Sequence, residues 1–177
     1  IFHPAIYPIL GTFVLLRSLP MQYPSKMVLL TVVMVFCGTY LIPLIASVIL
    51  FRYGLLRTLH MEDARDRRLP YIFTAVSFYF TSLLLRQVEV LHEAYLFLLA
   101  SATVIIIHLL LLPYTKPSAH MGGVGGFIGL ILALSFSYGL NLWPYIAGLI
   151  LLSGFIASAR LQLNAHRVPE LWLGFFS

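Results

Sequence analysis

The chain has 177 residues, of which 60% are hydrophobic and only 10% are charged, and its formal net charge is +5. Because soluble domains carry roughly 25% charged residues, this composition excludes an ordinary water-soluble globule and indicates an integral membrane protein. Regular apolar–polar alternation is absent, which favours helices over a transmembrane barrel. The basic residues cluster in short segments between apolar runs, a pattern that fits lipid phosphates and argues against nucleic acid as the partner.

Hydropathy predicts an all-α, polytopic transmembrane helical bundle of about six spans. The expected spans, in chain order, are residues 5–16, 27–51, 70–85, 94–112, 121–138 and 143–157. Pro43 is expected to kink the second span, and Pro70 suits the first helical turn of the third. Residues 171–177 look like the start of another helix. We therefore expect residues 1–177 to form a single integral-membrane domain, in a chain that continues beyond Ser177.

Three polar clusters interrupt the apolar runs, at residues 52–68, 116–120 and 158–170. Two predicted spans separate the first cluster from the second, and two more separate the second from the third. An even number of crossings returns the chain to the same membrane face. Because polar groups beside lipid are costly and usually have a function, we expect the three clusters to form one site.

The third cluster holds a histidine and a carboxylate four residues apart, His166 and Glu170. Pro169 between them favours a helix that begins there. A carboxylate that accepts a hydrogen bond from one imidazole nitrogen fixes the tautomer and leaves the other nitrogen free to attack. Arg160, at the end of the sixth span, can bind a phosphate through two parallel hydrogen bonds. The alternative is that Arg160 and Arg167 only extend to the membrane interface, with His166 as an ordinary loop residue.

The second cluster contains Lys116, Ser118 and His120 directly before the fifth span. Ser118 is a good N-cap, and the free N–H groups of a helix start bind anions. In that first turn His120 can give a proton to a departing alkoxide oxygen, with the charge of Lys116 just outside. An ordinary capped helix with an interfacial lysine is the alternative.

Together these segments resemble the type 2 phosphatidic acid phosphatase (PAP2) superfamily, in particular its small bacterial membrane members. Pro117-Ser118-Ala119-His120 matches the Pro-Ser-Gly-His signature except at the third position. Arg160, His166 and Glu170 keep the spacing of a later signature, with Ala159 in place of Ser and Glu in place of Asp. Phe2-His3-Pro4 is similar to the start of small bacterial members.

The first signature of that superfamily, Lys, six residues and Arg-Pro, is where the sequence departs. Leu69 stands where Arg is expected and Glu62 where Lys is expected. The nearest substitutes are Arg65, Arg67 and Arg68. Lys116 can supply the missing lysine charge.

The resemblance implies a membrane lipid phosphate phosphatase that needs no metal or other cofactor. His166 would attack phosphorus and become a phosphohistidine, Glu170 would orient it, and His120 would protonate the leaving lipid oxygen. The phosphate-binding residues would be Arg160, Lys116, Arg67, Arg65 and Ser118. The substrate would be a lipid phosphomonoester or pyrophosphate, and the protein would cross the cell inner (cytoplasmic) membrane several times.

Two further functions stay open at this point. The same basic cluster would suit a non-catalytic lipid-binding or transport protein, and a purely structural bundle would keep the three clusters apart. Orientation is also open, because the excess of arginine on the cluster face predicts a cytoplasmic site whereas the resemblance implies an outward-facing one.

The glycine run from Gly122 to Gly129 does not follow a strand, so a nucleotide-binding loop is not expected. Its glycines have the four-residue spacing that lets helices approach closely. We expect His108, inside the fourth span, to make a structural hydrogen bond within the bundle.

Overall fold

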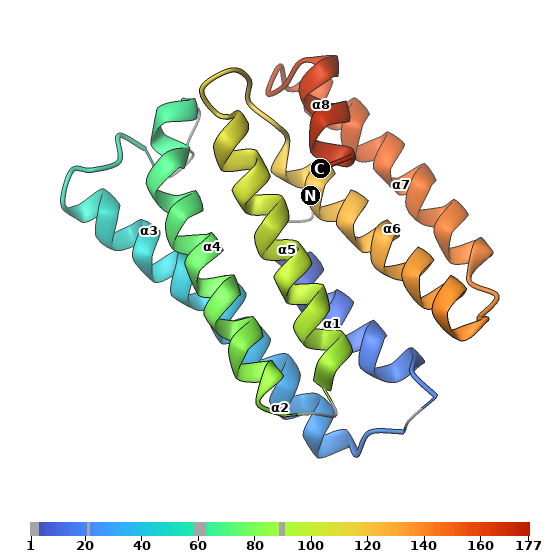
Figure 1. The fold of residues 1–177 in the computed structure, drawn as a ribbon. Coiled ribbons are helices and arrows are strands. Elements are labelled where there is room, and N and C mark those ends of the chain that lie inside the picture. The colour runs from blue at the N-terminus through green and yellow to red at the C-terminus, as the bar shows by residue number, and fades with distance from the viewer. Residues whose placement is uncertain (1–3, 21, 59–62, 89–90) are drawn as a thin grey trace.

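A computed structural model describes residues 4–20, 22–58, 63–88 and 91–177 of the protein. Phe2, His3 and Glu62, which entered the family comparison, lie outside these residues. The described chain folds into a bundle of helices, and none of it forms a strand (Figure 1). The elements are α1 (Ile6–Ser18), α2 (Ser25–Phe36), the π-helix η1 (Cys37–Leu41), α3 (Ile42–Arg52), α4 (Ala64–Arg86), α5 (His92–Leu111), α6 (Ala119–Tyr138), α7 (Trp143–Gln162) and α8 (Val168–Phe175). The predicted all-α bundle is confirmed.

Five helical stretches of the described chain are long and apolar enough to cross a membrane. They are Ser25–Arg52, Arg65–Arg86, His92–Leu111, Ala119–Tyr138 and Trp143–Gln162. The remaining predicted span, residues 5–16, corresponds to α1, whose 13 residues rise only ~20 Å against a hydrocarbon core of about 30 Å. The chain is therefore a multi-pass membrane protein with about five full-length spans and one shorter apolar helix.

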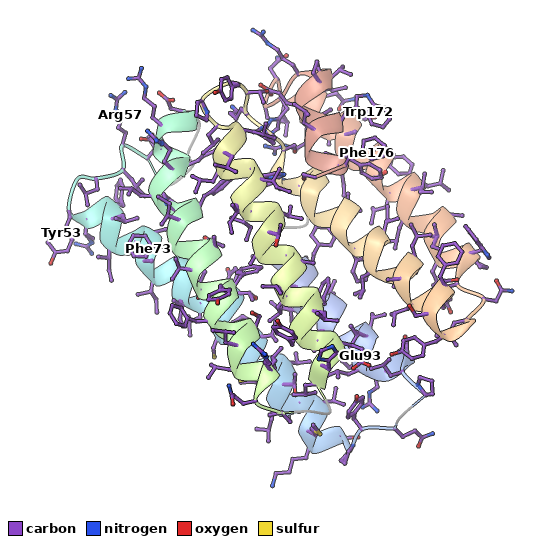
Figure 2. All side chains as sticks on the ribbon, in the orientation of Figure 1. Tyr53, Arg57, Phe73, Glu93, Trp172 and Phe176 are labelled. Atoms are coloured by element: carbon purple, nitrogen blue, oxygen red, sulfur yellow. The ribbon has the colours of Figure 1, made fainter. Side chains whose placement is uncertain are left out.

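The outer surface of the bundle carries large apolar side chains. Phe136 is 72% exposed and Phe155 is 76% exposed. Figure 2 shows Trp172 of α8 and Phe176, the residue after that helix, directed outwards. Such a surface would be unstable in water but costs nothing against lipid tails.

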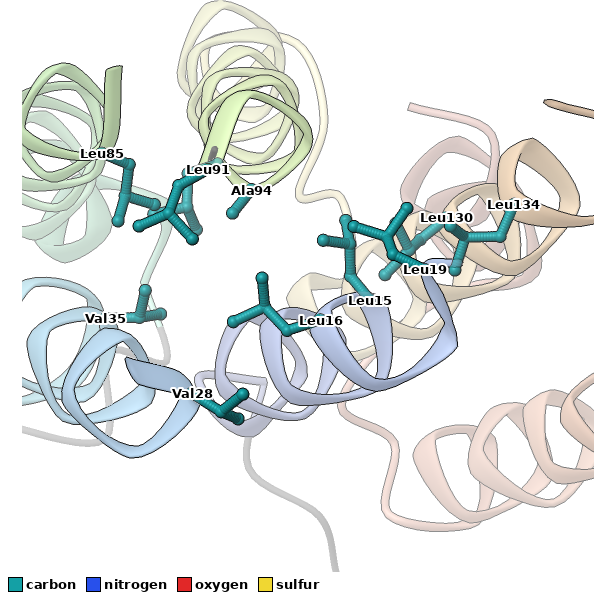
Figure 3. Close-up of a cluster of buried hydrophobic side chains, with 11 residues drawn as sticks. Leu15, Leu16, Leu19, Val28, Val35, Leu85, Leu91, Ala94, Leu130 and Leu134 are labelled. Atoms are coloured by element: carbon teal, nitrogen blue, oxygen red, sulfur yellow. The ribbon is translucent and has the colours of Figure 1, made fainter. Parts of the chain in front are cut away.

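The main buried cluster joins α1 to its neighbours. Apolar side chains of α2, α5 and α6 surround Leu15 and Leu16 of α1 and Leu19, the residue that follows this helix, as Figure 3 shows. Leu15, Leu85 and Leu98 are almost completely buried. The short helix α1 is therefore packed against α2, α5 and α6 through these side chains, while Leu10 and Phe13 on the same helix are exposed.

A π-helix stands where Pro43 was expected to kink the second span. Helix α2 continues through η1 into α3, and Pro43 lies in the first turn of α3. Proline has no N–H to bond the carbonyl four residues earlier, and its ring crowds that carbonyl. That carbonyl belongs to Thr39. The wider π turn accommodates the proline, and the hydroxyl of Ser77 in α4 donates to the carbonyl of Gly38, one residue earlier.

Helix α4 begins six residues earlier than predicted, so the expected start at Pro70 is wrong. Asp63 caps the helix by accepting a hydrogen bond from the N–H of Arg65 at 3.0 Å. Pro70 lies inside α4, at the cost of one backbone hydrogen bond. The last part of the Arg-rich link is consequently helical, which fixes the directions of its arginines.

Helix α8 begins at Val168, as Pro169 predicted, and packs against the start of α6. A Cβ atom on Gly122 would lie 3.2 Å from the carbonyl oxygen of Gly174, and one on Gly125 would overlap the carbonyl of Phe175. Cβ atoms on Gly126 and Gly129 would meet nothing within 4 Å. The predicted close approach is thus confirmed at Gly122 and Gly125, in the first turns of α6, where the partner is α8, and not at Gly126 and Gly129 further along the helix.

Candidate functional site

The three polar clusters meet at one end of the bundle, where α4 and α6 begin and α7 ends (Figure 1). They border a cavity of about 480 Å³ that extends between the helices. Arg67, His120, Arg160 and His166 all line it, and most of its remaining wall is apolar. A mostly apolar pocket with a few convergent polar groups is the usual form of a ligand site.

The imidazole of His166 is held at one nitrogen by two acceptors. Its Nδ1 lies 3.2 Å from Oε2 of Glu170 and 3.1 Å from the carbonyl oxygen of Lys116. Neither partner can donate when the carboxylate is ionised, so Nδ1 carries the proton. In the neutral ring Nε2 then keeps its lone pair, as the spacing of His166 and Glu170 predicted.

Burial lowers the pKa of His166 from its ordinary value. The hydrogen bond and charge of Glu170 act to raise that pKa, while the cations Arg67 and Arg160 lower it further. The net direction is downward. The neutral ring with its free lone pair is therefore the dominant form near pH 7.

The first turn of α8 ties two clusters together through Glu170. Oε2 of Glu170 also accepts the N–H of Arg167 at 3.0 Å, and its backbone carbonyl accepts the N–H of Ser118 at 3.0 Å. Burial acts to raise the pKa of Glu170, but the hydrogen bonds from Arg167 and His166 and the charge of Lys116 outweigh it and lower the pKa. Glu170 is thus an ionised carboxylate near pH 7.

Ser118 occupies the predicted N-cap position of α6, but its side chain does not cap the helix. Its carbonyl accepts the N–H of Gly122 at 2.9 Å, and its N–H is already bonded to Glu170. The hydroxyl is fully buried without a hydrogen-bond partner among the described residues. The predicted capping hydrogen bond is wrong, because the contact with α8 decides how this segment is held.

The cations predicted for phosphate binding occupy different positions. Arg160, in the last turn of α7, lines the cavity, and its Nε atom is buried without a partner in the described part of the chain. Arg67 lines the cavity from α4, whereas Arg65 is exposed and does not. Two residues along a helix are ~200° apart, so these two arginines point to opposite sides. Lys116 is half-buried. Its carbonyl oxygen contacts Nδ1 of His166, and its positive charge helps to lower the pKa of Glu170.

The cavity wall also includes polar residues that were not assigned to the site from the sequence, among them Tyr7, Tyr71 and His108. Tyr71 follows Arg67 by one helical turn, and the Arg67 side chain hydrogen-bonds its phenol. This pair would follow from the helical spacing once α4 is known to begin at Ala64. His108 is buried, and its Nε2 lies 2.8 Å from the hydroxyl of Ser177, which confirms the expected structural hydrogen bond.

No family model, curated protein or solved structure matches the chain. Within the described residues, no group of three or more His, Cys, Asp or Glu side chains is arranged to hold a metal ion. The site is therefore interpreted from its own groups. It combines a neutral, acid-oriented imidazole, a second imidazole and two guanidinium groups around one cavity.

Proposed function

We propose that the protein is a lipid phosphate phosphatase of the cell inner membrane that acts through a phosphohistidine. The observation that carries the proposal is that Nδ1 of His166 lies against two acceptors, the carboxylate of Glu170 and the carbonyl of Lys116, beside a cavity that Arg67, Arg160 and His120 also line. An imidazole oriented in this way is an activated nucleophile. The neighbouring guanidinium groups supply the positive charge that stabilises a phosphoryl group during its transfer.

In the first step the Nε2 lone pair of His166 attacks phosphorus, and the bond between phosphorus and the lipid oxygen breaks. His120 gives its proton to that departing oxygen. In the second step water attacks the phosphohistidine and passes a proton to His120. The nitrogen–phosphorus bond breaks, inorganic phosphate leaves, and both histidines return to their initial forms.

Arg67 and Arg160 stabilise the charge that develops on the phosphoryl oxygens. Both guanidinium groups lie on the cavity wall, and the buried Nε of Arg160 has no partner among the described residues that would compete with a phosphate. One preorganised donor to a developing negative charge is worth about 100-fold to 1000-fold in rate. Glu170 compensates the positive charge that His166 acquires as it attacks.

The substrate class follows from the surroundings of the site. The cavity runs from the cations into an apolar interior within a membrane bundle, which suits a phosphomonoester or pyrophosphate attached to a lipid. The resemblance of the His120 and His166 segments to the type 2 phosphatidic acid phosphatases supports the same conclusion.

The test is phosphate release by purified protein in detergent with a lipid phosphomonoester and with a lipid pyrophosphate, in the presence of EDTA. We expect turnover that is lost in His166→Ala and kept in His92→Ala, which alters an exposed histidine at the start of α5. Binding of the lipids without release of phosphate would instead support a non-catalytic lipid-binding or transport protein.

A further inference from the structure

Tyr71 lies beside Arg67 on the cavity face of α4. The two residues are four apart, so their side chains are neighbours on one face of the helix, and both line the cavity. Arg67 has a long side chain with many rotamers, and near the end of a span such a side chain can extend to the membrane interface instead of the interior. Its direction therefore depends on the groups that it contacts.

The phenol of Tyr71 accepts a hydrogen bond from the side chain of Arg67. A guanidinium has donors only, so the phenol oxygen must be the acceptor. Its N–H groups form one rigid, planar fork, and an acceptor on one of them fixes the direction of the others. Because the phenol is neutral, this hydrogen bond orients Arg67 without neutralising its charge. A carboxylate in the same place would neutralise it.

His108 of α5 packs against the ring of Tyr71. The two ring centroids are 6.5 Å apart, and the planes are tilted by 36°. The imidazole is itself held, because its Nε2 lies 2.8 Å from the hydroxyl of Ser177, which donates to the carbonyl of Gly174 at 2.8 Å. A Cβ atom on Gly122 would lie 2.8 Å from Cε1 of His108, so α6 also leaves this ring no room to turn. Tyr71 therefore packs against a ring that α6 and the end of α8 hold in place.

We propose that Tyr71 is a positioning residue, which aims the guanidinium of Arg67 at the phosphate in the cavity. The inference rests on the proposed function, in which Arg67 stabilises the charge on the phosphoryl oxygens. Tyr71 acts only through Arg67 and takes no part in bond making or proton transfer. Without its phenol oxygen, Arg67 keeps its charge but loses the contact that holds it at the cavity wall.

The kinetic test is Tyr71→Phe, which keeps the ring and removes the acceptor. We expect kcat/KM for phosphate release from a lipid phosphate to fall about 10-fold to 100-fold, because a misplaced group loses most of its effect on the transition state. The same substitution in Arg67→Ala protein should change kcat/KM less than about twofold, since no guanidinium is left to aim. Tyr79→Phe, which alters an exposed tyrosine further along α4, should change neither protein. Melting temperatures verify that each variant is folded.

A second measurement reports the place of Arg67 without turnover. Burial lowers the pKa of His166, and the charge of Arg67 lowers it further. If the guanidinium leaves the cavity wall, the titration midpoint of His166, followed by NMR, should rise in Tyr71→Phe as it does in Arg67→Ala. In Arg67→Ala protein, Tyr71→Phe should leave the midpoint where it is. A purely structural role of Tyr71 would change the melting temperature and not this midpoint.

An unchanged midpoint of His166 in Tyr71→Phe would overturn the assignment of Tyr71. Unchanged kcat/KM in an active protein would overturn it too, as would an equal fall in kcat/KM with and without Arg67. A rise of the midpoint that depends on Arg67, in a protein that releases no phosphate, would support the positioning of Arg67 and contradict the phosphatase instead.

Discussion

The carboxylate of Glu170 joins its own helix to the imidazole of His166. Its Oε2 lies 3.2 Å from Nδ1 of His166 and accepts the N–H of Arg167 at 3.0 Å. The second contact belongs to the capping box of α8, so the start of the helix fixes where the carboxylate points. Orientation of the imidazole is thereby coupled to the fold of α8.

Replacing Glu170 by Gln tests the contribution of this carboxylate. The Gln carbonyl can take the place of Oε2 and accept from both Arg167 and Nδ1 of His166, but the negative charge that compensates the attacking imidazole is lost. We expect kcat for phosphate release to fall about 100-fold or more, with KM nearly unchanged. Steady-state kinetics with a lipid phosphate measure both constants. The control is Glu93→Gln, which alters a carboxylate bonded to Tyr138 at the other end of the bundle and should leave kcat unchanged. An unaltered kcat in Glu170→Gln would remove Glu170 from the mechanism.

The lowered pKa of His166 predicts how its ring titrates. An ordinary histidine is half-protonated near pH 6.5, so His166 should stay neutral to a lower pH and lose its lone pair only below it. Because Arg67 lowers this pKa and Glu170 raises it, Arg67→Ala should move the midpoint up and Glu170→Gln should move it down. NMR of histidine-labelled protein in detergent, with His166→Ala for assignment, gives the midpoint. A value at or above 6.5 in the unmodified protein would be inconsistent with the burial of this ring.

Arg67 and Arg65 form a matched pair on the first turns of α4. Arg67 lines the cavity and Arg65 is exposed on the other side of the helix. We expect Arg67→Ala to reduce kcat/KM for phosphate release about 100-fold to 1000-fold, and Arg65→Ala to stay within about threefold of the unmodified protein. Equal effects of the two substitutions would mean that the arginines act only through the overall charge of this face.

Gly174 sets the distance between α8 and the start of α6. A Cβ atom there would overlap the carbonyl oxygen of Ser118 and lie 3.0 Å from its nitrogen. Gly174→Ala should destabilise the protein by about 1–3 kcal/mol, because two backbones would have to separate. Unfolding in detergent measures the change, and Gly129→Ala, whose Cβ would meet nothing within 4 Å, is the control. If the free energies of unfolding of the two variants are equal, α8 and the segment at Ser118 can separate without a measurable cost.

Much of the fold followed from hydropathy because lipid demands long apolar helices. The predicted spans at 121–138 and 143–157 begin within two residues of α6 and α7. The start of α4 was missed because the apolar run begins near Pro70, whereas the cap at Asp63 lies among charged residues. The π turn before Pro43 was not predicted. Its Gly38 carbonyl accepts a hydrogen bond from Ser77, which lies 39 residues further along the chain, so neighbouring residues in the sequence do not indicate this contact.

Some contacts of the site were likewise predictable from the sequence, and others were not. His166 and Glu170 are neighbours on one local segment, so their spacing alone predicted the hydrogen bond between them. Separating Arg67 from Arg65 requires both residues to be helical, whereas the sequence predicted a link there and a helix only from Pro70. Tyr7 gave no signal, because an aromatic residue in an apolar run looks like core until its contact with Gly123 is known.

In the proposed mechanism His166 bonds covalently to phosphorus. Rapid quenching of the purified protein with a ³²P-labelled lipid phosphate, followed by mapping of the label, tests whether this bond forms. We predict an acid-labile, alkali-stable phosphoryl group on His166 that forms and decays at rates consistent with kcat. Turnover of the lipid by His166→Ala at the rate of the unmodified protein, or a label on another residue, would contradict the account.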